Sequence, residues 1–96
     1  MRAAGAPTTL SLDVDDIYAA TEPIRFAVRP SDDGVALDAI IEQVDQPAAR
    51  QVVHLPAADA EWRHREVSPL PPGIYRITVQ GNPAIVEPVS DVFGVA

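Results

Sequence analysis

The chain is short, acidic and of ordinary globular composition. It has 96 residues, of which 47% are hydrophobic and 22% charged, and its formal net charge is −7. This length allows one domain with one modest core, and the composition excludes a disordered tail or a fibrous repeat. Fourteen acidic residues oppose seven scattered arginines, and lysine is absent. We therefore expect neither nucleic acid nor an anionic membrane surface as a partner, because both attract clustered positive charge.

Cysteine and long apolar runs are also absent. Without cysteine, no disulfide, thiolate zinc site or cysteine nucleophile can form. No apolar run approaches the roughly 20 residues of a transmembrane helix. Residues 1–7 contain one arginine and lack the apolar centre of a signal peptide. We expect them to be a flexible lead-in to a single domain over residues 8–96, and the sequence leaves the cellular compartment open.

Short alternating segments, separated by ten prolines and five glycines, fill the chain. No segment shows the period of a helix, so little or no helix is expected. The alternation predicts seven strands, and seven strands in about 90 residues are typical of an antiparallel, all-β sandwich of the immunoglobulin-like, Greek-key type. Residues 17–22 are expected to form a loop or an irregular edge that Tyr18 holds in place. The predicted strands cover residues 8–14, 23–29, 35–44, 49–55, 61–67, 74–80 and 85–95.

The same alternation predicts which side chains form the core. In residues 35–44, the carboxylates of Asp38 and Glu42 would be costly to bury, so the opposite face is predicted to point inward. In residues 61–67, Trp62 is expected to be buried because it is the largest apolar group available. The orientation of the last strand stays open, because Asp91 shares a face with its apolar residues. The expected core contains Leu12, Phe26, Val28, Leu37, Ile41, Trp62, Tyr75, Ile77 and Val79.

The segment with the most specific pattern runs from Leu70 to Val79. Leu70, Pro72 and Gly73 form a rigid turn, and Tyr75 follows near the start of the next strand. This pattern resembles the tyrosine corner of Greek-key sandwiches, in which the tyrosine hydroxyl bonds to upstream backbone. Here we expect a bond to the backbone near residues 68–70. The chain is similar in this respect to fibronectin type III domains and to many bacterial immunoglobulin-like accessory domains. The resemblance implies a non-catalytic accessory module within a larger, bacterial, multidomain protein.

One face of the predicted sandwich has the composition of a docking surface. Aliphatic side chains left over from the core are expected to lie there beside one arginine and two carboxylates, a mixture found at protein interfaces. The alternative is a set of scattered surface aliphatics, which are normal on soluble proteins. We expect contacts with a neighbouring domain or a protein partner, and weak self-association is possible through the same face. The predicted interaction face consists of Asp38, Ile40, Glu42, Val44, Ile74, Arg76 and Thr78.

None of the other polar groups is predicted to hold a cofactor or a metal. Asp13, Asp15 and Asp16 are either turn residues or weak calcium ligands. His54 and His64 lack the spacing of a zinc motif. The arginines at 25, 29, 63 and 65 either share one face that binds an anion or pair with glutamates across the strands, and we favour pairing.

Two functions from different classes remain. The first is the docking or spacing module. The alternative is a free-standing sandwich that binds a carbohydrate or a small anion through its loops. The expected burial of most of the five aromatic residues argues against stacking on sugars.

Overall fold

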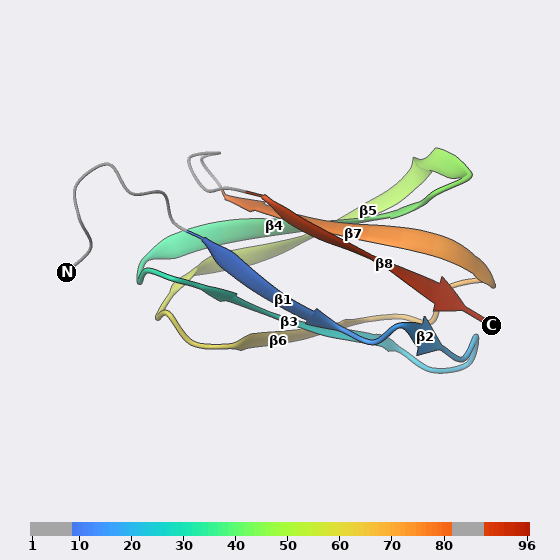
Figure 1. Cartoon of the computed structure of the whole chain (residues 1–96), viewed down its shortest axis with the longest axis horizontal. Helices are drawn as coiled ribbons and strands as arrows, with labels where there is room; N and C mark the ends of the chain where they lie inside the picture. The colour runs from blue at the N-terminus through green and yellow to red at the C-terminus, as the bar shows by residue number, and fades with distance from the viewer. Residues whose placement is uncertain (1–8, 82–87) are drawn as a thin grey trace.

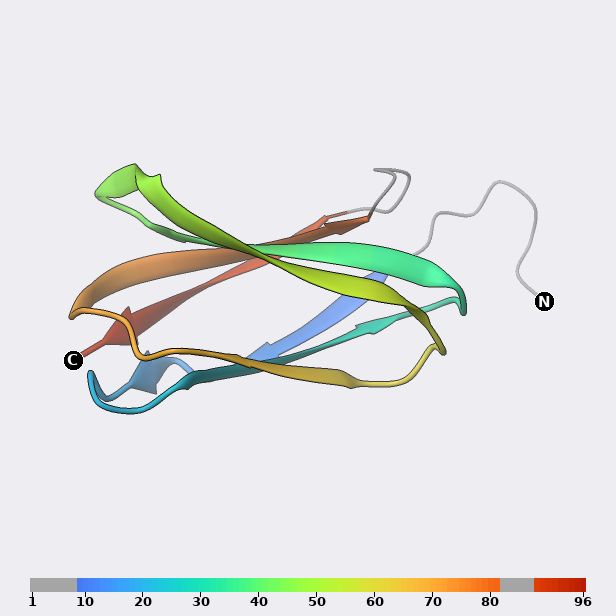
Figure 2. The same ribbon diagram turned by 180° about the vertical axis from the view of Figure 1, so that it is seen from behind.

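Two β-sheets pack face to face in the computed structural model, which describes residues 9–81 and 88–96, apart from the side chains of residues 47–49. Figures 1 and 2 show the two layers from opposite sides. The predicted lead-in over residues 1–7, the turn after Gly81 and the start of the last predicted strand lie outside the described residues. All regular elements described are strands: β1 (Leu10–Val14), β2 (Ile17–Tyr18), β3 (Ile24–Pro30), β4 (Val35–Gln43), β5 (Gln46–Ala58), β6 (Arg63–Val67), β7 (Gly73–Gly81) and β8 (Val89–Val95).

The strands form a three-stranded sheet, β1-β3-β6, and a five-stranded sheet, β2-β8-β7-β4-β5. All pairs are antiparallel except that of β2 with β8, which is parallel. The all-β prediction is confirmed. The described residues contain eight strands where seven were predicted, because residues 17–18 pair with the end of β8 instead of forming a loop. The fifth strand is also longer than predicted, since it takes in Gln46 and the Pro56–Ala58 segment that were assigned to turns.

Alternation along the strands places the core as predicted in most of the chain. Ile24, Phe26 and Val28 on β3 are buried, as are Leu37 and Ile41 on β4. Tyr75, Ile77 and Val79 on β7 are buried as well, beside β4 in the same sheet. Leu12 is half-buried and packs against this core. In β8, Phe93 and Val95 are buried while Asp91 stays exposed, which resolves the orientation of the last strand.

Trp62 contradicts the predicted core. Its side chain is 41% exposed, and its neighbour Arg63 is buried instead, with 7% exposed. The reason is the orientation of β6: Arg63 lies opposite the buried Val28 and Val67 opposite the buried Ile24. The face shared by His64 and Glu66 therefore points to solvent, where the Glu66 carboxylate pairs with Arg25 at 3.0 Å.

Aromatic side chains close one end of the core. The Tyr18 ring meets the Phe93 ring edge-on, with the ring centroids 5.4 Å apart. The Tyr75 ring stacks on the Phe93 ring, with the centroids 5.6 Å apart. The Tyr18 hydroxyl donates to the Arg25 carbonyl at 2.6 Å and accepts from the Asp15 amide at 3.0 Å. This confirms that Tyr18 holds the edge segment. Burial raises the pKa of Tyr18, so its neutral, hydrogen-bonded form persists to strongly alkaline pH.

The tyrosine-corner bond is present but its acceptor differs from the one predicted. The Tyr75 hydroxyl donates to the carbonyl of Pro71 at 2.7 Å, four residues upstream, and not to residues 68–70. The turn at Pro72 and Gly73 brings this later carbonyl within reach of the hydroxyl, since β7 already begins at Gly73.

We predict that Tyr75→Phe lowers the free energy of unfolding by about 1 kcal/mol, because the Pro71 carbonyl loses a partly buried donor. Tyr18→Phe should cost at least as much, since that hydroxyl makes two hydrogen bonds. Chemical denaturation monitored by circular dichroism measures both, with the exposed Ser90→Ala as the control. If Tyr75→Phe unfolds with the parent's midpoint, the corner bond does not stabilise the fold.

Candidate docking face

The outer surface of the five-stranded sheet carries the predicted interaction face. Strand register places Ile40 of β4 between Val52 of β5 and Thr78 of β7. Two residues further along β4, Glu42 lies between Arg50 and Arg76. Two residues in the other direction, Asp38 lies between His54 and Gln80. The residues of β4 and β7 alternate with buried ones, so they point away from the core, and the β5 residues are their register neighbours.

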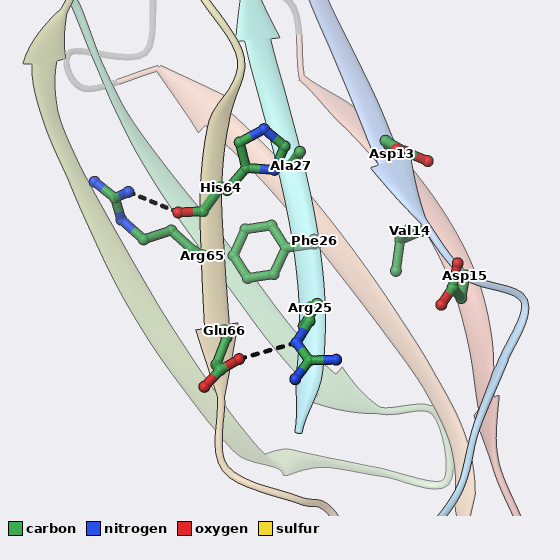
Figure 3. A pocket seen from close by; sticks show the side chains of 9 residues that line it. All are labelled: Asp13, Val14, Asp15, Arg25, Phe26, Ala27, His64, Arg65 and Glu66. Carbon is green, nitrogen blue, oxygen red and sulfur yellow. Dashed lines mark hydrogen bonds and ion pairs between the residues drawn. The ribbon is translucent and has the colours of Figure 1, made fainter. Parts of the chain in front are cut away.

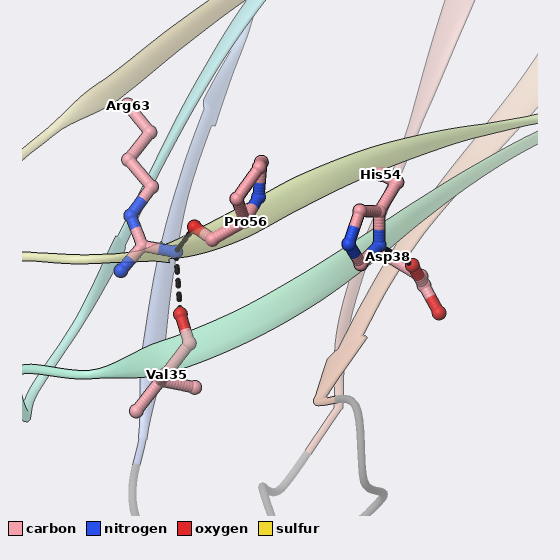
Figure 4. A network of polar contacts seen from close by, with 5 residues as sticks. All are labelled: Val35, Asp38, His54, Pro56 and Arg63. Atoms are coloured by element: carbon pink, nitrogen blue, oxygen red, sulfur yellow. Dashed lines mark hydrogen bonds and ion pairs between the residues drawn. The ribbon is translucent and has the colours of Figure 1, made fainter.

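The charged groups on this face are matched across the strands. His54 Nδ1 lies 2.8 Å from Asp38 Oδ1, and the Asp38 side chain is the more buried partner. Figure 4 shows this pair on the broad strands β4 and β5. Glu42 has an arginine as its register neighbour on each side. Opposite charges on adjacent strands stabilise the sheet modestly, and here they leave the face close to electrically neutral.

The apolar part of the face surrounds Gly94 at the end of β8. Ile17 is 68% exposed, Ile74 51% and Val92 45%. Gly94 pairs with Ile17 on one side and with Ile74 on the other, and it has no side chain to fill the space between them. A shallow, mainly apolar hollow of about 460 Å³ results, lined by these residues and by Asp16. Its floor is fixed by the bond from the Gly94 amide to the Asp16 carbonyl, 2.8 Å.

The structure brings all seven predicted residues to this one face, with differences in exposure. Ile74, Arg76 and Val44 are exposed. Thr78 and Ile40 are half-buried between their neighbours, as are Asp38 and Glu42. Val44 joins the apolar end, because its amide donates to the Ile74 carbonyl at 2.9 Å.

Three exposed aliphatics on the face were not predicted. Val52 follows from the predicted inward direction of Val53 and Leu55, so the alternation of that strand contained the signal. The exposure of Val92 could not be predicted because the orientation of the last strand was open. Ile17 belongs to a strand of two residues, which is too short to show a period.

A second, polar groove crosses the outer surface of the three-stranded sheet (Figure 3). Ala27 lies between Asp13 and His64 in the register, and its small side chain leaves the space open. Arg25 pairs with Glu66 along one side. The sequence left open whether Arg25, Arg29, Arg63 and Arg65 share an anion-binding face or pair with glutamates. Arg63 points inward, so the four arginines do not share one face. Arg25 pairs with Glu66, as predicted.

Metal-ligand geometry is absent from the described part of the chain. No three His, Asp or Glu side chains there lie close enough to share an ion. Asp13 and Asp15 line the polar groove (Figure 3), while Asp16 borders the apolar hollow on the other sheet. His54 and His64 lie on different sheets. Residues 9–81 and 88–96 also include no helix that is long and apolar enough to cross a membrane.

Comparison with known proteins bears on the fold. No protein-family profile matches the chain, and no curated protein sequence does. A CARDB domain from Pyrococcus furiosus, crystallised in complex with di-metal ions, is similar in structure, with a TM-score of 0.58. The fold is that of an immunoglobulin-like β-sandwich. The match covers 93% of this chain and 87% of that domain at 13% sequence identity.

We predict that Ile74→Ala changes the free energy of unfolding by no more than about 0.5 kcal/mol, because half of this side chain already contacts solvent. Ile77→Ala, three residues along the same strand, should cost about 2–5 kcal/mol because Ile77 is fully buried. Denaturant unfolding of the two variants makes the comparison. Equal losses would show that Ile74 belongs to the core and not to a docking face.

Proposed function

We propose that the chain is a non-catalytic accessory module that docks a neighbouring domain or a protein partner through the outer surface of its five-stranded sheet. The observation that carries the proposal is the group of exposed aliphatics around Gly94. Ile17, Ile74 and Val92 stay exposed, whereas Tyr75, Ile77 and Phe93 on the other face of the same sheet are buried. Contiguous apolar surface next to a hollow is a feature of interaction sites, whereas single exposed aliphatics carry no such meaning.

The hollow over Gly94 defines the partner's chemistry. It is open, shallow and mostly apolar, so it fits one or two apolar side chains projecting from a folded protein surface. A Cβ placed on Gly94 would lie 3.8 Å from Ile74 Cδ1, so a side chain here would occupy the space that the partner needs. Filling such a depression with an anchoring side chain concentrates binding energy at the centre of an interface.

The charge pattern supports docking of a protein surface. The chain as a whole carries −7, but the carboxylates of this face are neighbours of His54, Arg50 and Arg76. Locally balanced charges cost less to desolvate than an unpaired cluster of one sign. Arg76 also belongs to a residue type that is enriched at interfaces. An adjacent protein can therefore cover this surface without leaving an excess of buried negative charge.

The connectivity supports an accessory module of the fibronectin type III-like, Greek-key class. The central strands pair as β3-β6 in one sheet and as β4-β7-β8 in the other. The Tyr75 hydroxyl also bonds to upstream backbone as in a tyrosine corner. The architecture hosts many roles, so the docking proposal depends on the face itself.

We predict that Ile74→Glu combined with Val92→Glu abolishes association while leaving the melting temperature nearly unchanged. Both side chains border the hollow, and two carboxylates there would have to be desolvated by the partner. The matched control, Ala57→Glu with Ser68→Glu, adds the same charge at exposed positions outside the hollow. Binding is measured by calorimetry against the purified partner, and self-association of the chain by sedimentation.

Loss of binding in the first double variant alone supports the docking face. Equal binding by parent and variant would place the interface elsewhere. Unfolding of the variant would show that these side chains contribute to the core, and Ile74→Ser with Val92→Ser then provides the milder test of association.

A further inference from the structure

Trp62 stands apart from every other aromatic residue of the chain. The two tyrosines and two phenylalanines are buried, each at most 4% exposed, whereas Trp62 is 41% exposed. It directly precedes β6, at the end of the sandwich opposite the C-terminus (Figures 1 and 2). The folding of the core does not require an indole at this position, since Arg63 fills the inward place beside it.

Polar groups surround one side of the indole. A hollow of about 290 Å³ lies between the ends of β1 and β3 and the segment that leads into β6. Its lining includes the hydroxyl-bearing residues Thr9, Ser11 and Ser31 together with Arg29 and Trp62. Arg29 donates through Nε to the Ala60 carbonyl at 3.3 Å, and this bond leaves its two terminal nitrogens as donors for a ligand.

Hydrogen bonds fix the walls of this hollow. The Thr9 amide donates to Ser31 Oγ at 3.0 Å, and the Ser31 amide donates to the Thr9 carbonyl at 2.9 Å. The Ala60 amide donates to Asp33 Oδ1 at 2.6 Å. On the other side of Trp62, the Arg63 guanidinium is bonded to four backbone carbonyls. The segments on both sides of the indole are thus held by hydrogen bonds, so less conformational entropy is lost when a ligand binds.

We propose that this hollow binds a neutral saccharide. The apolar face of a sugar ring stacks on the exposed indole, the guanidinium donates to a pair of its hydroxyls, and the serine and threonine hydroxyls complete the hydrogen bonding. A neutral ligand is favoured over an anionic one because the chain carries −7 and because Asp33 lies close behind Ala60. This activity goes beyond docking and uses the opposite end of the molecule.

The exposure of Trp62 also favours sugar binding. Most aromatic residues are needed inside, but the one with the largest stacking surface is outside. The site is shallow, so we expect millimolar affinity for a single sugar unit and tighter binding for a longer oligosaccharide that extends beyond the hollow.

The single tryptophan makes the test direct, because selectively excited fluorescence reports on Trp62 alone. The folded chain is titrated with neutral oligosaccharides of glucose, xylose, mannose and N-acetylglucosamine, and with an acidic oligosaccharide of galacturonate. At least one neutral series is expected to give a saturable change in emission. Trp62→Ala should then weaken binding by about tenfold or more in calorimetry, and Arg29→Gln by a smaller factor.

Arg25→Gln is the matched control, since Arg25 is an exposed arginine of the same strand that pairs with Glu66 elsewhere. It should bind like the parent, as should Ile74→Glu with Val92→Glu, whose defect concerns docking only. No saturable change with any neutral series, binding that survives Trp62→Ala, or binding of galacturonate alone would each overturn the proposal.

Discussion

The buried guanidinium of Arg63 is the interaction on which the arrangement of one end of the molecule depends. It donates to the carbonyls of Val35 at 2.6 Å, Pro56 at 3.3 Å, Ala58 at 3.0 Å and Asp59 at 3.2 Å. Figure 4 shows the bonds to Val35 and Pro56. Arg63 belongs to the three-stranded sheet, whereas these carbonyls belong to β4, β5 and the residue after β5. One side chain thus ties the two sheets together where their strands begin or end.

The burial of the Arg63 side chain also determines that Trp62 is exposed. Burial lowers the pKa of Arg63, yet a guanidinium keeps its charge in proteins, so carbonyl dipoles must replace the lost water. Its Nε is buried without a partner, which makes the terminal nitrogens' four bonds more important. Because neighbours along a strand point to opposite sides, an inward Arg63 turns Trp62 outward. At the opposite end, Tyr18, Phe93 and Tyr75 close the core, and Gly94 leaves the hollow above them open.

The sequence predicts the fold well wherever one face of a strand is clearly cheaper to bury. In β4, two carboxylates excluded one face, and the buried Leu37 and Ile41 confirm the choice. In β6, both faces carry polar residues, and the rule that the largest apolar group is buried chose wrongly. Applying the carboxylate rule to Glu66 would have turned His64 and Trp62 outward. Three of the acceptors of Arg63 lie in residues 56–59 and the fourth is the distant Val35. These carbonyls meet the guanidinium only once the two sheets pack together, so the alternation of polar and apolar residues does not signal that an arginine can be buried there.

The candidate face was predictable for the central strands and not for its borders. The pairing of β4 with β7 follows from the expected order of strands, and it brings Ile40, Thr78 and Arg76 together. Ile17 reaches the face because β2 pairs parallel with the end of β8, and a strand of two residues carries no pattern that predicts this pairing. The hollow over Gly94 likewise arises from three strands that meet in space, and a glycine in a strand gives no indication of what surrounds it.

The most direct measurement of the central role of Arg63 is the free energy of unfolding of Arg63→Met compared with Arg65→Met. Both changes remove one arginine from β6, but the Arg65 side chain is exposed and bonds only to the adjacent His64 carbonyl among the described residues. Arg63→Met should lose about 2 kcal/mol or more, since it leaves carbonyls unsatisfied between the sheets. Arg65→Met should stay within about 0.5 kcal/mol of the parent. Equal stability of Arg63→Met and the parent would contradict the account.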